Sequence, residues 1–271
     1  MRNANPATLN KTDGCCGPNC GPTTCPPAST NINEVEQLLG HADSRQRLQG
    51  VRSLARHARD LPPTERPAIV EQLARVATDR EPFVRWNLAM ALGEIDHPAG
   101  IPVLARLAND EHANVRLRVA LSLGLIGDPA GIPILARYVE DSYKIGEHAV
   151  VRAFAAMALG KIGHVEAVPL LARLAADPDP VVRWHTAVAL GDVGNPIGLE
   201  ALTPLAQDPV PFTRAHTAVA LAEIGDPAGL PLLERLAEDK VPRVAAIAQA
   251  ARESLRACCV PHCGPGTCGC G

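Results

Sequence analysis

The chain has 271 residues, enough for one or two ordinary domains or for a single elongated one. Hydrophobic residues make up 46% of the sequence but aromatic residues only 3%, so alanine and leucine must do most of the packing, as in closely packed helices. The net charge of −3 argues against binding to nucleic acid, and no apolar run reaches the roughly 20 residues that cross a membrane.

The N-terminal segment, residues 1–32, contains clustered cysteines and no apolar stretch typical of a signal peptide. We therefore expect a cytoplasmic protein. Thiols stay reduced in that compartment, so clustered cysteines there more often bind metal than form disulfides. The motif is CCGPNCGPTTC, which supplies the thiols of Cys15, Cys16, Cys20 and Cys25.

Residues 33–257 are dominated by an internal repeat. The clearest unit reads PDPVVRWHTAVALGDVGNPIGLEALTPLAQD, and five such units follow one another after about one and a half degenerate units over residues 33–79. The marker arginines of the five units are Arg85, Arg116, Arg152, Arg183 and Arg214. They lie 31 residues apart, except for one step of 36 residues that contains an insertion, SYKIG, at residues 142–146.

Each unit is predicted to fold as two helices. The stretch VVRWHTAVALGDVG has apolar residues at helical spacing and reaches glycine, a frequent helix stop. A turn with proline follows, and proline suits the first turn of the next helix, for example GLPLLERLAED. Residues 240–257 supply one last helix.

The pattern D-P-x-V-R-x-x-A-A-x-A-L-G-x-I-G-D-P, over about residues 41–257, resembles HEAT-repeat proteins of the short-repeat type that also occurs in phycobilin lyases. The resemblance implies an all-α HEAT-repeat α-solenoid that presents a concave surface to a partner. It also implies that the aspartates and arginines of the motif bridge neighbouring units. The last helix has Ala245 in place of the arginine, which fits an end cap.

Residues one, two and five positions after each marker arginine are predicted to face away from the alanine–leucine seam. They would line a concave groove that binds a protein partner. An equally weighted alternative is that this stripe packs on adjacent helices. His185 and His216 occupy equivalent positions, which ordinary repetition explains better than a metal site does. The candidate partner-binding residues are Trp86, Met90, Leu117, Phe154, Trp184, His185 and His216.

The C-terminal segment, residues 258–271, contains CCVPHCGPGTC, which agrees with the N-terminal motif at eight of eleven positions. Its cysteines are Cys258, Cys259, Cys263 and Cys268, with Cys270 and His262 as extra donors. The two matched motifs predict that the solenoid carries cysteine-rich, metal-binding ends with the same task.

Four thiolates per motif are the number that an iron–sulfur cluster requires. Zinc sites commonly use C-x2-C pairs, which the chain lacks. We therefore expect two iron–sulfur clusters of the four-iron type, with zinc as the alternative and disulfides or reactive thiols as the third reading. The ends of such a rod lie roughly 50–60 Å apart, which favours separate clusters over a shared one.

These features predict an interaction protein that carries iron–sulfur clusters, docks a protein partner and serves electron transfer or cluster delivery. It is similar in plan to nitrogen-fixation-associated solenoids with an attached cluster, and that plan suggests a link to nitrogen fixation. One alternative is a zinc-binding or other metal-handling scaffold, and another is a bilin-lyase-like enzyme. The resemblance to deoxyhypusine hydroxylase is discounted, because its repeated His-Glu pairs do not occur in this sequence.

Overall fold

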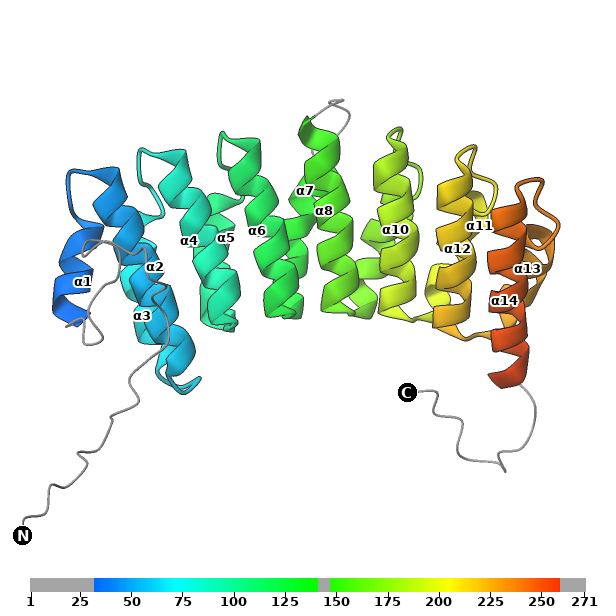
Figure 1. Cartoon of the computed structure of the whole chain (residues 1–271), viewed down its shortest axis with the longest axis horizontal. Helices are drawn as coiled ribbons and strands as arrows, with labels where there is room; N and C mark the ends of the chain where they lie inside the picture. Colours follow the sequence, from blue (N-terminus) through cyan, green and yellow to red (C-terminus); the bar gives the residue numbers. More distant parts are fainter. Residues whose placement is uncertain (1–31, 141–146, 259–271) are drawn as a thin grey trace, which may run out of the picture.

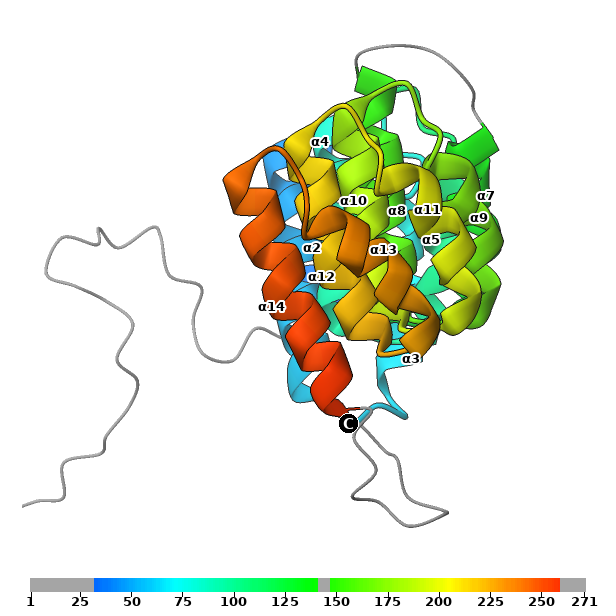
Figure 2. The ribbon, with the colours of Figure 1, turned by 90° about the vertical axis from the view of Figure 1, so that its right-hand side faces the viewer.

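The computed structural model describes residues 32–140 and 147–258, and all regular structure within those ranges is helical. The helices form two parallel layers that run the length of a rod (Figures 1 and 2). One layer contains the longer helices, side by side in chain order. The members of this long-helix layer are α2 (Ser44–Asp60), α4 (Pro82–Ile95), α6 (Ala113–Ile126), α8 (Glu147–Ile162), α10 (Pro180–Val193), α12 (Pro211–Ile224) and α14 (Pro242–Cys258).

The second layer contains shorter helices, most of them preceded by a single 3-10 turn. Its members are α1 (Ile32–Leu39), α3 (Arg66–Leu73), α5 (Ile101–Leu107), α7 (Ile132–Glu140), α9 (Val168–Leu174), α11 (Leu199–Leu205) and α13 (Leu230–Leu236). The 3-10 turns are η1 (Ala74–Val76), η2 (Pro98–Gly100), η3 (Pro129–Gly131), η4 (Val165–Ala167), η5 (Pro196–Gly198) and η6 (Pro227–Gly229). The predicted helix pairs and their order are confirmed.

Local sequence explains where the long helices begin and end. Proline stands in the first turn of α10, and the Asp179 carboxylate caps this helix by accepting the backbone N–H of Val181 at 2.8 Å. At the other end, Gly194 takes a left-handed conformation with φ 63°, as glycine commonly does after a helix. Asp96 takes the same left-handed conformation after α4, with φ 51°, although a residue with a Cβ adopts it less readily than glycine does.

Small residues set the spacing of the long-helix layer. A Cβ added to Gly124 of α6 would lie 2.9 Å from the Cα of Ala158 in α8, and one added to Gly160 would lie 2.7 Å from the Cα of Ala189 in α10. The short helices contact one another far less than the long ones do. Because one layer is more closely spaced, the rod bends with the long-helix layer on its inner side.

A row of arginine–aspartate pairs joins neighbouring units, as the family resemblance implied. In each pair the arginine Nε and one terminal nitrogen donate to the two carboxylate oxygens, the geometry that a guanidinium favours. Each arginine pairs with the aspartate at the end of its own unit. Arg85, Arg183 and Arg214 also donate to the backbone carbonyl of the aspartate that ends the preceding unit, as Arg85 does to Asp79. The pairs of this Arg–Asp ladder are Arg47–Asp79, Arg85–Asp110, Arg152–Asp177, Arg183–Asp208 and Arg214–Asp239.

The ladder fixes the charge states of its members. Burial alone would raise the pKa of Asp110, but hydrogen bonds from Arg85 and from the backbone of His112 outweigh it and hold that pKa below its ordinary value. The hydrogen bond from Arg214 is the main cause that lowers the pKa of Asp239. Asp239 is the last carboxylate of the ladder. Ala245 stands where α14 would carry the next arginine, consistent with the predicted end cap.

Several sequence-based predictions fall outside the described residues. They include the insertion at 142–146 and every cysteine of the two motifs except Cys258, whose backbone ends α14 and whose side chain is not described. The expected metal-binding ends therefore stay predictions. Among residues 32–140 and 147–258, no helix combines the length and apolar character that crossing a membrane requires.

Candidate functional site

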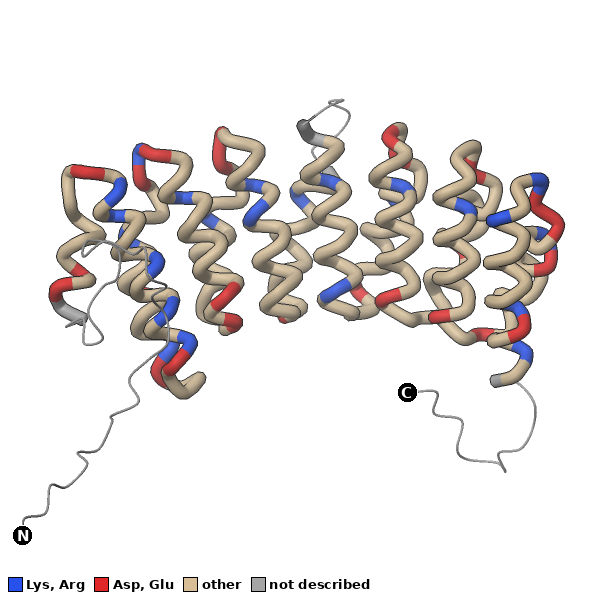
Figure 3. The backbone as a smooth tube through the Cα atoms, in the orientation of Figure 1, with Lys and Arg blue, Asp and Glu red and all other residues tan. Residues whose placement is uncertain are grey.

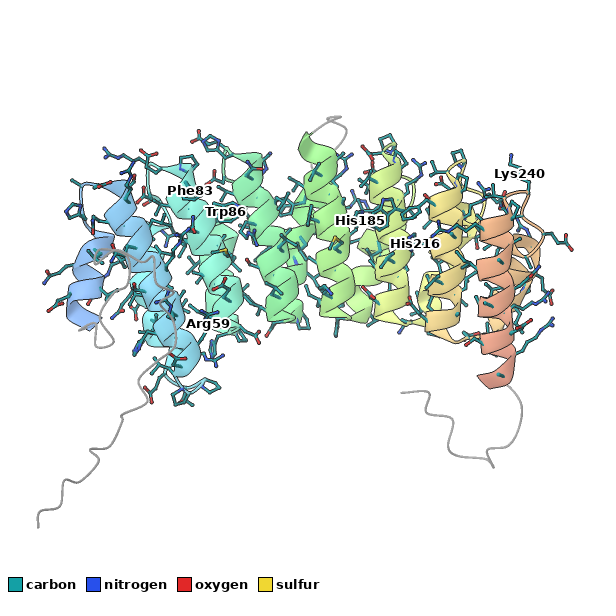
Figure 4. The ribbon with its side chains drawn as sticks, in the orientation of Figure 1. Arg59, Phe83, Trp86, His185, His216 and Lys240 are labelled. Atoms are coloured by element: carbon teal, nitrogen blue, oxygen red, sulfur yellow. The ribbon has the colours of Figure 1, made fainter. Side chains whose placement is uncertain are left out.

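The predicted partner-binding residues share the exposed side of the long-helix layer, which we call the inner face. Figure 4 labels Phe83, Trp86, His185 and His216 on it. In Figure 3 the middle of this layer is mainly uncharged, while α2 carries several basic positions. An α-helix returns to the same side every three or four residues, so the residues two before, one or two after and five after a ladder arginine lie toward this face, although Asn87 at one of these positions is fully buried.

An aromatic–histidine cluster lies across α10 and α12. We call Trp184, His185, Phe212 and His216 the C-terminal cluster. The Trp184 and His185 rings stack with centroids 3.6 Å apart, and Phe212 meets Trp184 edge-on at 5.2 Å. His216 lies 4.4 Å from Phe212 and 5.4 Å from Trp184. Such aromatic contacts hold four large side chains in a fixed arrangement at the surface.

The C-terminal cluster borders an apolar cavity between α12 and α14. The cavity has a volume of about 580 Å³ and is lined by Phe212, His216, Val219, Arg243 and Ile247, among others. Phe212 is 51% exposed and Val219 is 38% exposed, so apolar surface remains open to solvent here. A cavity of this size and character is typical of a site that accepts an apolar side chain or a small ligand.

Both histidines of the cluster favour the neutral form. Burial lowers the pKa of His185, partly offset by the hydrogen bond between its Nδ1 and the Val181 carbonyl oxygen at 2.7 Å. Burial also lowers the pKa of His216, and the nearby His185 lowers it further. The cluster is therefore uncharged near neutral pH and suited to apolar contacts.

A second cluster lies across α4 and α6. The N-terminal cluster consists of Phe83, Trp86 and Arg118. The Phe83 and Trp86 rings are parallel, with centroids 6.0 Å apart, and the Arg118 guanidinium carbon lies 4.5 Å from the centre of a Trp86 ring. Arginine on an indole face is a favourable cation–π contact. A cavity of about 500 Å³ beside it is lined by Phe83, Trp86 and His112, among others.

Of the other predicted residues, Phe154 on α8 lies between the two clusters, whereas Leu117 and Met90 lie on α6 and α4, the helices of the N-terminal cluster. Leu117 and Phe154 are half-buried and pack against the core, and Met90 is half-buried too. These half-buried residues are consistent with both interpretations, partner binding and packing on adjacent helices. Part of each side chain contacts neighbouring helices, and the rest remains accessible. Asn87, at an equivalent position in α4, is fully buried and donates to the Phe83 carbonyl at 2.7 Å.

Sequence reasoning missed two members of these clusters. Phe83 and Phe212 lie two residues before a ladder arginine, a position that the prediction did not consider. The signal was present in the sequence: Phe83 stands three residues before Trp86, and Phe212 stands four before His216. Side chains at those separations are neighbours on a helix.

The described residues offer no metal centre. No group of three or more histidine, cysteine, aspartate or glutamate side chains among them is placed to hold a metal ion. His185 and His216 are a pair without a third ligand in that part of the chain. The predicted ligands Cys15, Cys16, Cys20, Cys25, Cys259, Cys263, Cys268, Cys270 and His262 lie outside it, as does the Cys258 side chain.

Comparison with known proteins identifies the scaffold. No curated protein matches the sequence. The solved complex of CpcE and CpcF of phycocyanin lyase from Nostoc sp. PCC7120 is 19% identical over 88% of this chain and 98% of that chain, with a TM-score of 0.51. An engineered protein is 23% identical over 83% of this chain and 68% of that chain, with a TM-score of 0.50. These two likenesses concern the fold.

The likeness to human deoxyhypusine hydroxylase is weaker, with 19% identity over 83% of this chain and 96% of that chain and a TM-score of 0.37. A family model for HEAT repeats matches residues 67–149, 144–213 and 198–256. The matched ranges cover most of the helices of both layers. The chain therefore belongs to the HEAT-repeat family.

Proposed function

We propose that this protein is an interaction scaffold that binds a protein partner on its inner face. The observation that carries the proposal is the C-terminal cluster beside its apolar cavity. Phe212 and Val219 expose apolar surface next to Trp184, and large exposed aromatics of this kind serve as anchors in protein interfaces. Solenoids of stacked helix pairs commonly use their concave surface for such contacts.

Site-specific photo-crosslinking tests this proposal. A photoreactive phenylalanine analogue would replace Val219 on the inner face or, as a control, Ile197 on the turn η5. Ile197 is 66% exposed and therefore at least as accessible. We expect a discrete adduct with one cellular protein from position 219 and none from position 197. Equal labelling at both positions would refute a specific inner-face interface.

We also propose that the two terminal motifs carry iron–sulfur clusters that serve electron transfer or cluster delivery to the bound partner. Support comes from the sequence alone: two matched sets of four cysteines, near the two ends of the solenoid. Bound metal at those places would also cover the apolar ends of the terminal units, as solenoid caps do. Zinc in the same thiolate sets is the alternative, with a structural or metal-handling role.

Metal analysis of anaerobically purified protein separates these readings. We expect brown protein with matched iron and sulfide, and colourless protein with stoichiometric zinc would refute the clusters. Cys20→Ser and Cys263→Ser should each remove one centre. Loss of all metal from either variant would show a shared site. Both Cys→Ser variants should still fold, because the described helices form a continuous hydrophobic core from Val35 to Leu255.

A bilin-lyase-like activity is a second candidate that shares the scaffold. The fold likeness to the phycocyanin lyase complex favours it over other enzyme classes. The apolar cavity beside Phe212 offers space for a small ligand. Titration with a free bilin, followed by visible absorbance, tests this candidate. Saturable binding that Phe212→Ala weakens would support it, and no spectral change would exclude it.

A further inference from the structure

Arg118 of α6 differs from the arginines of the Arg–Asp ladder. Each ladder arginine has a carboxylate partner, whereas no described carboxylate lies within ion-pair distance of Arg118. Its Nε atom is buried without a hydrogen-bond partner in the described part of the chain. A desolvated guanidinium without a counter-charge is costly, so a missing partner would stabilise it.

A second group of arginines lies across α4 from Arg118, on α2. Arg52, Arg56 and Arg59 of α2 line a cavity of about 220 Å³ between α2 and α4, together with Met90 and Glu94. Glu94 is the sole acidic residue in that lining, and its carboxylate lies 3.7 Å from Arg59. The same glutamate is the nearest acidic influence on Arg118. Glu94 is thus the acidic residue shared by the three α2 arginines of the cavity and by Arg118, in a chain whose net charge is −3.

Apolar side chains adjoin both groups of arginines: Trp86 lies under Arg118, and Met90 lines the cavity of the α2 arginines. Phe83 is 56% exposed and stacks beside Trp86, and Met90 lies half-buried on the same helix. The charge of the inner face differs between its ends, because α2 carries Arg52, Arg56 and Arg59 against Glu94 of α4, whereas α10 and α12 carry Asp192 and Glu223. The N-terminal part of the face is therefore complementary to a segment that combines acidic and bulky apolar side chains.

We propose that the N-terminal part of the inner face binds an acidic peptide segment of the protein partner, with one carboxylate on Arg118 and an adjacent apolar side chain against Phe83 and Trp86. Further carboxylates of the segment face Arg52, Arg56 and Arg59. This inference rests on the proposed function and names the chemistry of its partner. A peptide is favoured over nucleic acid because four arginines beside apolar side chains form no long basic track for a phosphate backbone.

Selection from a random peptide library displayed on phage tests the proposal without knowledge of the partner. The full chain would be the bait, and Arg118→Gln and Arg106→Gln the comparison baits. Arg106 is an exposed arginine on α5 in the short-helix layer, so it controls for loss of one positive charge. We expect a consensus with acidic residues beside an aromatic or aliphatic one, lost with Arg118→Gln and kept with Arg106→Gln.

The consensus peptide can then be titrated against a chain with one tryptophan. The sequence contains two tryptophans, so Trp184→Phe leaves Trp86 as the reporter at the proposed site. We expect a saturable change in Trp86 fluorescence and an affinity that falls as salt increases. Arg118→Gln in this background should weaken binding about tenfold or more, because a charge-assisted hydrogen bond is lost. Arg118→Lys should restore part of the affinity.

The outcomes separate this inference from the proposed function. Peptides without acidic residues, or equal binding to Arg118→Gln, would overturn the inference. Tighter binding of single-stranded poly(U) than of the peptide would also overturn it, in favour of nucleic acid. If selected peptides instead lost affinity with Phe212→Ala alone, the inner face would bind a partner at the C-terminal cluster, and only the acidic site would be wrong. Absence of any inner-face binder would refute both.

Discussion

The ladder arginines and the residues just after them lie on adjacent sides of the same helices, yet the two sets differ in kind. The ladder repeats one pair of residue types with one geometry from Arg47–Asp79 to Arg214–Asp239. The inner face changes from Trp86 with Arg118 at one end to Trp184 with His216 at the other. Contacts between units must recur in every unit, whereas contacts with a partner need not. Regular positions therefore stabilise the rod, and irregular positions are available for recognition.

The largest expected effect comes from breaking the ladder. Arg152→Ala should lower the free energy of unfolding by about 3–5 kcal/mol, because it leaves the buried Asp177 carboxylate without its counter-charge. The two side chains are only 4% and 6% exposed. Urea unfolding followed by circular dichroism measures the change. Arg106→Ala on the exposed surface of α5 should change the same quantity by less than about 0.5 kcal/mol. Similar changes in the free energy of unfolding for both variants would show that the ladder does not stabilise the fold.

The next largest effect concerns the inner face and should appear in binding. Phe212→Ala should weaken binding of the crosslinked partner roughly tenfold or more, as truncation of an anchor does. It should change stability little, because Phe212 is 51% exposed. Ile197→Ala removes a still more exposed apolar side chain outside the cluster and should leave affinity unchanged. Equilibrium binding measurements with the purified partner test this prediction. Equal losses of affinity in Phe212→Ala and Ile197→Ala would contradict a binding role of the inner face.

A smaller effect tests a regular position where the sequence departs from the repeat. Asp96 holds a left-handed conformation with φ 51° at the site where Gly127, Gly194 and Gly225 stand in other units. Asp96→Gly should raise the free energy of unfolding by about 1 kcal/mol, because that conformation costs a non-glycine residue roughly this much. Gly127→Asp should lower it by a similar amount. Thermal unfolding measures both, and partner affinity should stay constant.

The smallest expected effect is a pH dependence of stability, which differs between the histidines of the inner face and the aspartates of the ladder. The pKa values of His185 and His216 are lowered in the folded state, mainly by burial. The unfolded chain then binds more protons, so stability from these residues is present above about pH 6.5 and is lost as pH falls through their folded pKa values. The pKa of Asp110 is also lowered, so the ladder weakens only below about pH 4.

Fluorescence of Trp184 in a Trp86→Phe variant can follow the histidine titration, because His185 stacks on Trp184 at 3.6 Å. We expect a transition with a midpoint below the ordinary histidine pKa of about 6.5. The His185→Gln variant serves as the control and should lose most of the transition. A midpoint above that value would mean that the protonated histidine has a stabilising partner, in conflict with a neutral cluster.

Much of the scaffold was predictable from the sequence because its determinants are local. The 31-residue period, the proline in the first turn of helices such as α10 and Gly194 at a helix end specify the helix pairs without any knowledge of long-range contacts. The family resemblance supplied the bridging role of the ladder. It did not specify that Arg85 pairs with Asp110 at the end of its own unit while it donates to the carbonyl of Asp79 at the end of the preceding unit.

The candidate site was less predictable. Trp184, His185 and His216 were expected together, but Phe212 completes their cluster from a position that the prediction left out. Arg118 and Asn87 occupy equivalent positions in neighbouring units, yet one lies over Trp86 and the other is fully buried. Position in the repeat therefore did not determine exposure, because the side chains on the preceding helix differ: Arg52 of α2 donates to Asn87, whereas Arg118 lies over Trp86 of α4.

The sequence by itself determined the repeat, the helix pairs, the ladder residues and the matched cysteine motifs, because each depends on residue type and spacing along one chain. Tertiary structure decided which helices form the inner layer and which side chains meet there. Helical periodicity defines the faces of a single helix, but the distance between stacked helices depends on close contacts such as Gly124 with Ala158. The same stacking leaves Arg118 over Trp86 without a carboxylate partner among the described residues.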